Sequence, residues 1–101
     1  LTLVSTRTCE GNTVMLGEAN YGILADGKTC EFALVVADDM AGKGLGAKLM
    51  RCLMEAAREQ GLGAMQGEVM PDNEAMLALM EVLDFSIHHT DDGVLEVSRR
   101  L

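Results

Sequence analysis

The sequence predicts a fold that combines helices and strands, in the α/β (α+β) class, with a mixed, mostly antiparallel sheet flanked by two helices. Three observations support this prediction. Hydrophobic residues make up 49% of a chain of 101 residues. The spacing of apolar residues changes from the two-residue period of strands to the roughly 3.6-residue period of helices near the middle. Turn residues separate the short apolar segments. A chain of this length accommodates one core, so we expect a single domain over residues 1–101.

Three strand-like segments occupy the first third of the chain. Residues 2–8 and 13–21 are rich in β-branched and apolar residues, and Glu10-Gly11-Asn12 between them predicts a hairpin turn. Asp26-Gly27 predicts a second turn. Residues 30–36 follow it and form the most strongly strand-like segment in the chain.

The hydrophobic period becomes helical between residues 44 and 60. Apolar side chains at helical spacing form one stripe there: Leu45, Leu49, Leu53, Ala56 and Ala57. Arg51 and Arg58 flank Glu55 at helical spacing, which favours ion pairs along the surface of the helix. Gly61 is a typical residue to end it.

The second half of the chain adds a strand, a helix and a final pair of strands. We expect a strand over residues 64–70. A helix should follow it, with Asp72 or Asn73 as its N-terminal cap. The apolar face of that helix consists of Met76, Leu79, Met80 and Leu83. Residues 85–89 and 94–99 predict closing strands. The expected order is β-β-β-α-β-α-β-β, in which hairpins precede one crossover, so the sheet is mixed rather than doubly wound.

The composition limits the classes of partner. A net charge of −8 repels phosphate backbones, so we expect no nucleic-acid partner; the acidity either attracts cationic acceptors or only keeps the domain soluble. The sequence contains neither a secretion signal nor an apolar run of membrane-spanning length, so we expect a cytoplasmic protein without a membrane partner. Cys9, Cys30 and Cys52 form no C-x-x-C pair and indicate reduced thiols, and we expect no metal site.

Glycines alternate at positions 42, 44 and 46, directly before the first predicted helix. Glycine lets the backbone approach a ligand, and the start of a helix offers unpaired N–H groups and the positive end of its dipole, so a phosphate group is the expected occupant. A merely flexible turn is the plainer alternative. The P-loop pattern is excluded because Lys43 is followed by Gly44. The glycine spacing also matches the dinucleotide-binding consensus G-x-G-x-x-G/A. We set this alternative aside because residues 37–41 separate the strand from the first glycine and no further βαβ units follow.

The sequence resembles the GNAT superfamily of N-acetyltransferases in two segments. Residues 34–46 resemble the family's acetyl-CoA motif, an apolar strand followed by Arg/Gln-x-x-Gly-x-Gly/Ala. Residues 69–85 resemble the second motif, in which an Asn opens a helix that ends in Leu-Gly-Phe. Residues 30–33 (Cys-Glu-Phe-Ala) are similar to the GNAT module of bacterial protein lysine acetyltransferases. The resemblance covers residues 30–101, with residues 1–29 as the preceding hairpin.

The resemblance implies transfer of an acetyl group from acetyl-CoA, as co-substrate, to a primary amine, either a protein lysine or a small amine, by direct attack. Glu31 occupies the position of the catalytic base, and we expect burial beside Ala33 and Val35 to raise its pKa. Backbone groups near Leu34 and Val36 would pair with the pantetheine arm. The residues assigned to the cofactor are Leu34, Val35, Val36, Ala41, Gly42, Lys43, Gly44, Leu45, Gly46, Ala47 and Asn73.

Some assignments have simpler explanations. A plain helix cap explains Asn73 nearly as well as a contact with the cofactor arm. Tyr21 is the only tyrosine, and we expect a structural role for it. Cys30 is interpreted as a packing residue rather than a nucleophile, because direct transfer needs none.

The sequence also departs from the family pattern. Ala41 stands where Arg or Gln is usual, Asp84 replaces the Gly of Leu-Gly-Phe, and Met80 occupies the position of a tyrosine acid in many relatives. The family's first strand and first two helices have no counterpart before Leu1, so the domain is expected to be N-terminally incomplete. A non-catalytic acyl-CoA-binding regulatory module is therefore the alternative function. A second copy or an additional chain that completes the sheet is the expected protein partner.

Overall fold

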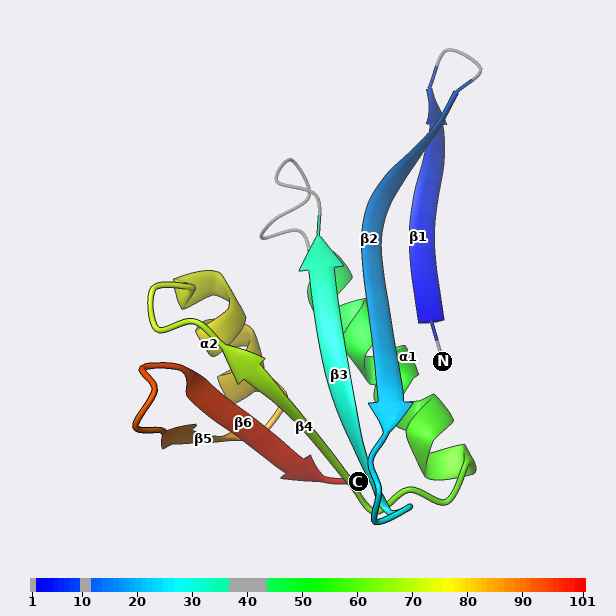
Figure 1. Cartoon of the computed structure of the whole chain (residues 1–101). Coiled ribbons are helices and arrows are strands. Elements are labelled where there is room, and N and C mark those ends of the chain that lie inside the picture. The colour runs from blue at the N-terminus through cyan, green and yellow to red at the C-terminus, as the bar shows by residue number, and fades with distance from the viewer. Residues whose placement is uncertain (1, 10–11, 37–43) are drawn as a thin grey trace.

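The computed structural model describes residues 2–9, 12–36 and 44–101, with side chains from residue 17 onward (Figure 1). Six strands form one sheet in the order β1-β2-β3-β4-β6-β5. The strands are β1 (Thr2–Cys9), β2 (Asn12–Ile23), β3 (Thr29–Val36), β4 (Ala64–Val69), β5 (Ser86–His89) and β6 (Leu95–Arg100). The helices are α1 (Leu45–Glu59) and α2 (Glu74–Val82). The predicted fold class and element order are confirmed, and element ends differ from the expected ones by at most two residues.

The sheet is antiparallel except at its centre. β1 pairs with β2, β2 with β3, β4 with β6 and β5 with β6, all antiparallel, with an irregularity in β1 between Ser5 and Thr6. β3 and β4 are parallel because α1 connects them as a crossover. The hairpin expected around Glu10-Gly11-Asn12 is present, since Cys9 pairs with Asn12, although Glu10 and Gly11 themselves lie outside the described residues.

Both helices cover the same face of the sheet, behind the strands in Figure 1. Side chains alternate along β3: Cys30 and Phe32 are buried beneath the helices, whereas Glu31, Ala33 and Val35 are exposed on the opposite face. Except for Leu95, the buried hydrophobic residues that the structure describes form one cluster. The largest fully buried side chains of this core are Met50, Leu53, Met65, Met80, Val97 and Cys30. Methionine fills irregular space because its thioether side chain is unbranched and flexible.

The two helices end in the same hydrogen-bonded motif. After α1, Gly61 has φ of 85°, and its N–H and that of Leu62 bond to the last turn. After α2, Asp84 has φ of 62°, its N–H donates to Glu81 O at 3.1 Å, and Phe85 N–H donates to Met80 O at 2.9 Å. This is the Schellman arrangement, whose left-handed residue is usually glycine. Gly61 is confirmed as the end of the first helix, and Asp84 occupies the equivalent position without the freedom of glycine.

Asp26 organises the turn between β2 and β3. Its carboxylate accepts hydrogen bonds from the N–H groups of Lys28 and Thr29, each at 2.9 Å, and from the Thr29 hydroxyl at 2.7 Å. These donors stabilise the charged form and lower the pKa of Asp26, the Lys28 N–H most strongly. The turn predicted at Asp26-Gly27 is confirmed. Within the described residues, neither helix has the length and hydrophobicity that crossing a membrane requires.

Candidate functional site

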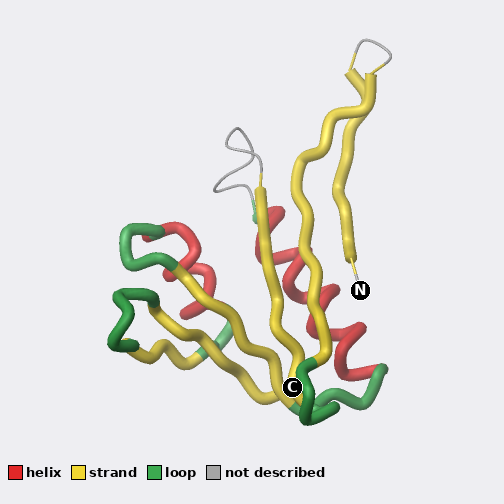
Figure 2. Tube along the Cα trace, in the orientation of Figure 1, coloured by secondary structure: helices red, strands yellow, loops and turns green. Residues whose placement is uncertain are grey.

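β3 and β4 are paired only over their first three residues. The register runs from Thr29 with Ala64 to Glu31 with Gln66 and stops there. Beyond Glu31 the two strands diverge, as Figure 2 shows for the two central yellow strands. Within the described part of the chain, the remainder of β3 pairs with β2 alone. One backbone edge of β3 is therefore available for hydrogen bonds to an extended ligand, in the way an added strand would bind.

The side chains of β3 divide between the two faces. Leu34 and Val36 are half-buried on the helix face, whereas Val35 is 62% exposed on the opposite face. The predicted cofactor residues Leu34, Val35 and Val36 are thus brought together on the unpaired part of β3. Their side chains do not point to a common space, so any shared contact with a ligand would be through the backbone.

Gly44 begins α1 in a conformation that favours glycine. It is the N-cap, with φ of 82° and ψ of 0°, no side chain caps the helix there, and Lys48 N–H bonds to Gly44 O at 3.1 Å. The first turn contains no acidic residue. The N–H groups that open a helix lack partners within it, so this end can bind an anion. Of the predicted loop, Ala41, Gly42 and Lys43 lie outside the described residues.

Gly46 is needed for packing. A Cβ at this position would lie 3.3 Å from Leu79 Cδ2 and 3.6 Å from both Leu34 Cδ2 and Val36 Cγ2. The absence of a side chain therefore lets α1 approach β3 and α2 closely. Leu45 and Ala47, which flank Gly46 in the first turn, are half-buried. The alternating glycines thus differ in their roles: Gly44 provides a backbone conformation and Gly46 provides space.

Glu31 lies at the last paired position before β3 and β4 diverge. Its register partners are Gly22 on β2 and Gln66 on β4. The expected sharing of a face with Ala33 and Val35 is confirmed, but the expected burial is wrong because all three residues are exposed. Both helices lie on the other face, which leaves this carboxylate open to solvent. Gln66 was missed by sequence reasoning, because its proximity to Glu31 depends on the parallel register.

Asn73 caps α2. Its Oδ1 accepts a hydrogen bond from Met76 N–H at 3.2 Å, and Glu74 adds a favourable charge to the first turn. Asn73 is therefore confirmed as the cap, in preference to Asp72. A contact with a cofactor arm stays a prediction. Met80, at the position that resembles the family's tyrosine acid, is completely buried in the core.

Tyr21 and Cys30 are structural. The Tyr21 hydroxyl donates to Gln60 Oε1 at the end of α1, and burial, followed by the nearby Cys30, raises the pKa of Tyr21. The Cys30 thiol is buried, lies 3.5 Å from Ala64 O, and has its pKa raised by desolvation. Both groups are kept neutral on the helix face of the sheet, whereas Glu31 lies on the opposite face. Among the described residues, no three His, Cys, Asp or Glu side chains are grouped to hold a metal ion.

Comparison with known families decides what this arrangement is. The model of the acetyltransferase (GNAT) family matches residues 4–85, which include the diverging strands and the start of α1. This chain belongs to the acetyltransferase (GNAT) family.

Similar proteins support membership of the GNAT family. An L-methionine sulfoximine/L-methionine sulfone acetyltransferase of Pseudomonas aeruginosa is 39% identical over 77 residues, covering 72% of this chain and 45% of that protein. The L-amino acid N-acyltransferase MnaT of Escherichia coli is 37% identical over 82 residues, covering 77% of this chain and 48% of that protein. This GNAT chain therefore spans about half the length of the curated relatives it matches.

Solved structures share the GNAT fold. YncA of Salmonella typhimurium, solved with its cofactor acetyl-CoA, has a TM-score of 0.76 at 25% identity, covering 87% of this chain and 59% of that one. The GNAT domain of S. lividans PAT has a TM-score of 0.83 at 22% identity, covering 99% of this chain and 61% of that one. The second likeness establishes the fold alone.

Proposed function

We propose that this chain forms the acetyl-CoA-binding part of an N-acetyltransferase that acts on a primary amine. The observation that carries the proposal is the end of the β3–β4 pairing at Glu31 and Gln66, followed along the chain by a glycine-initiated helix. The free edge of β3 suits the amide groups of a pantetheine arm, and the start of α1 suits a pyrophosphate. Membership of the GNAT family supports assigning both features to one cofactor.

The chemistry requires few groups from the protein. The amine nitrogen attacks the thioester carbonyl carbon, a C–N bond forms, the C–S bond breaks, and CoA leaves as the thiol after taking up a proton. The attacking nitrogen loses a proton to a base. In our proposal Glu31 is that base, because it is an exposed carboxylate at the point where the strands diverge. A backbone N–H on the unpaired edge of β3 would polarise the carbonyl.

The acceptor in this proposal is a small amine such as an amino acid, with a protein lysine as the alternative. Relatives at 37–39% identity are named for L-amino acids and for methionine sulfoximine and sulfone. The lysine alternative comes from the resemblance of residues 30–33 to protein lysine acetyltransferases. The net charge of −8 favours a cationic acceptor such as a simple amine or a lysine side chain over a zwitterionic amino acid.

A non-catalytic acyl-CoA-binding role is the second candidate. It is favoured by the position of Tyr21, the only tyrosine in the chain. Tyr21 pairs with Phe32 next to the divergence, but its side chain is buried on the helix face and its hydroxyl donates to Gln60, so it faces away from Glu31. Met80 is buried where many relatives carry a tyrosine acid. A domain of this kind would bind the thioester without assisting departure of the thiol.

Two measurements on this chain separate the candidates. Calorimetric titration with acetyl-CoA and with CoA should show saturable binding of both ligands. Free-thiol release should then be followed across a panel of L-amino acids, simple amines and lysine peptides. Amine-dependent release supports the enzyme, and binding without release for any acceptor supports the regulatory module. If neither ligand binds at roughly millimolar concentration, where binding free energies are only about −4 kcal/mol, the proposal is wrong.

A further inference from the structure

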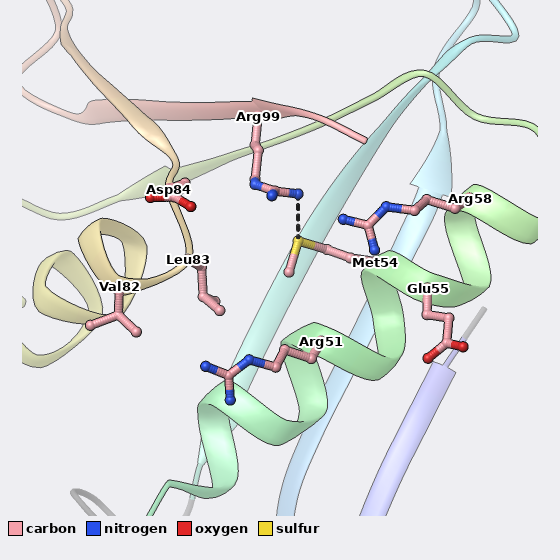
Figure 3. Close-up of a pocket in the computed structure, with 8 residues that line it drawn as sticks. All are labelled: Arg51, Met54, Glu55, Arg58, Val82, Leu83, Asp84 and Arg99. Atoms are coloured by element: carbon pink, nitrogen blue, oxygen red, sulfur yellow. Dashed lines mark hydrogen bonds between the residues drawn. The ribbon is translucent and has the colours of Figure 1, made fainter.

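A cavity lies between α1, the end of α2 and the end of β6 (Figure 3). Its volume is about 330 Å³. The residues that line it are Arg51, Met54, Glu55, Arg58, Val82, Leu83, Asp84 and Arg99. Met54 and Leu83 are buried and form an apolar wall, whereas Val82 is 66% exposed at the opening.

Three arginines from two elements surround this cavity. Arg51 and Arg58 extend from α1 and Arg99 extends from β6. Figure 3 shows the guanidinium groups of Arg58 and Arg99 beside the Met54 sulfur and that of Arg51 below Leu83. Arg99 Nη1 is held by Met54 Sδ at 3.8 Å and by Arg100 O at 3.3 Å. The chain has only eight Lys and Arg residues against sixteen acidic ones, so three in one cavity form a strong local concentration of positive charge.

Two carboxylates, Glu55 and Asp84, also line the cavity and reduce the net charge of its lining to +1 (three arginines against two acidic residues), but neither of them forms an ion pair with an arginine in the described part of the chain. The ion pairs expected within α1 from Arg51 and Arg58 to Glu55 are not formed, and no described residue makes an ion pair with either arginine. In Figure 3 the Glu55 carboxylate points away from the three guanidinium groups. The guanidinium groups of Arg51 and Arg58 have no partner among the described residues, whereas Arg99 is held by Met54 and Arg100. The hydrogen-bond donors of Arg51 and Arg58 are therefore available for an external anion.

Most of the arginine cavity lies away from the start of α1, where the proposed acyl-CoA site is. Arg99 pairs with Met65, which pairs with Cys30 at the beginning of β3. The glycine segment follows Val36, six residues further along β3, which corresponds to roughly 20 Å at 3.3 Å per residue. Arg58 and Arg99 therefore lie near the opposite end of the sheet from the start of α1, whereas Arg51 lies only seven residues along α1 from Gly44, roughly 10 Å at 1.5 Å per residue.

We propose that this arginine cavity binds a small phosphate monoester at a site distinct from the acyl-CoA site. A carboxylate presents two coplanar oxygens, which one guanidinium group can satisfy, whereas three guanidinium groups approaching from different directions suit the tetrahedral oxygens of a phosphate. The volume is at the lower end for small-molecule sites, so the ligand is small. Met54 and Leu83 would contact its carbon skeleton, and the exposed Asp84 would accept a hydrogen bond from a hydroxyl group.

The proposal can be tested by titrating the whole chain with inorganic phosphate, glycerol 3-phosphate and uncharged glycerol. NMR detection of the arginine Nε–H signals reports binding directly. Arg51→Gln and Arg58→Gln each remove one exposed guanidinium group, and Lys28→Gln makes the same charge change on an exposed residue that does not line the cavity. Both phosphates should shift the signals of Arg51, Arg58 and Arg99, and glycerol should not. Each arginine variant should weaken glycerol 3-phosphate binding by about ten-fold or more, and Lys28→Gln by less than about two-fold.

A repeat with saturating CoA distinguishes this cavity from the proposed cofactor site. Glycerol 3-phosphate should still bind with unchanged affinity, and loss of binding in direct competition with CoA would assign the cavity to the cofactor instead. The proposal is also overturned if neither phosphate shifts the arginine signals, or if the arginine variants bind as tightly as Lys28→Gln. If CoA does not bind, the proposed function is contradicted. The phosphate-binding proposal is still tested in that case, because it depends on comparing the arginine variants with Lys28→Gln.

Discussion

The Phe32 ring lies directly over Gly67. A Cβ at Gly67 would be only 2.5 Å from Phe32 Cε1 and 2.8 Å from Cζ. Phe32 is on β3 and Gly67 is on β4, one residue beyond the last pair of the parallel register. The same ring packs edge-on against Phe85, with centroids 5.6 Å apart. Where backbone pairing between the strands ends, the core therefore continues across the divergence through an aromatic side chain.

Gly67→Ala should destabilise the fold because the new methyl group must displace the Phe32 ring. We expect a loss of about 1–3 kcal/mol in the free energy of unfolding, the usual cost of overpacking a core. Chemical denaturation followed by circular dichroism measures it. Gly22→Ala is the matched control, because nothing lies within 4 Å of a Cβ at Gly22. Equal stability of the two variants would show that the ring is not constrained.

The sequence predicted every element of this fold because periodicity and turn chemistry are local properties. The period change near Gly44 and the left-handed glycine at Gly61 depend only on neighbouring residues. The fold class was also predictable, since hairpins and crossovers leave few arrangements. The sequence indicated one crossover, but the structure has two among its described elements, because α2 connects β4 to β5, which run parallel to each other with β6 between them.

The site was predicted less completely because its features depend on pairing between distant segments. Burial of Glu31 was expected from its apolar neighbours along the strand, but the helices cover the other face. Gln66 comes opposite Glu31, and Phe32 over Gly67, only through the β3–β4 register. Similarly, Arg99 joins the α1 arginines only when β6 is placed next to β4.

Asp84→Gly should stabilise the chain. Asp84 has φ of 62° at the end of α2, where a side chain is strained and a negative charge meets the negative end of the helix dipole. Removing both effects should add about 1 kcal/mol, which corresponds to an increase of roughly 4–8 °C in Tm for a domain of this size. Thermal unfolding measures the change. Gly61→Ala, which introduces a side chain at the equivalent position after α1, should lower Tm; a lower Tm for Asp84→Gly would contradict the argument.

Acid should weaken the turn that Asp26 organises. Hydrogen bonds from Lys28 and Thr29 lower the pKa of Asp26 in the folded chain. The resulting stabilisation is fully present above the unfolded pKa of about 3.9 and is lost as pH falls below it through the folded value. Asp26→Asn should therefore lose stability less steeply than the parent below about pH 4. Asp91→Asn, a change in another exposed turn, should keep the parental slope. Parallel acid profiles for Asp26→Asn and the parent would refute this origin of the pH dependence.

Gly44→Asp should weaken acetyl-CoA binding if the start of α1 holds the pyrophosphate. The variant places a negative charge where an anion is expected. Gly44→Asn is the matched control, because asparagine has almost the same shape, tolerates a left-handed conformation and carries no charge. We expect the dissociation constant measured by calorimetry to be at least about ten-fold higher for Asp than for Asn, a difference of about 1.4 kcal/mol. Equal affinities of the Asp and Asn variants for acetyl-CoA would show that the start of α1 does not bind the pyrophosphate.

Glu31→Gln tests whether the carboxylate at the divergence of β3 and β4 is the base. The substitution keeps the size and strand geometry but removes the basicity, so acetyl-CoA affinity should change little while turnover falls by roughly 100- to 10,000-fold. The loss should shrink as pH rises, because more of the amine is then already deprotonated in solution. Glu68→Gln is the control, since it removes an exposed carboxylate from β4 and should leave kcat unchanged. Turnover within a few-fold of the parent for Glu31→Gln at neutral pH would exclude Glu31 as the base. Loss of acetyl-CoA binding together with turnover would instead give Glu31 a role in holding the site together.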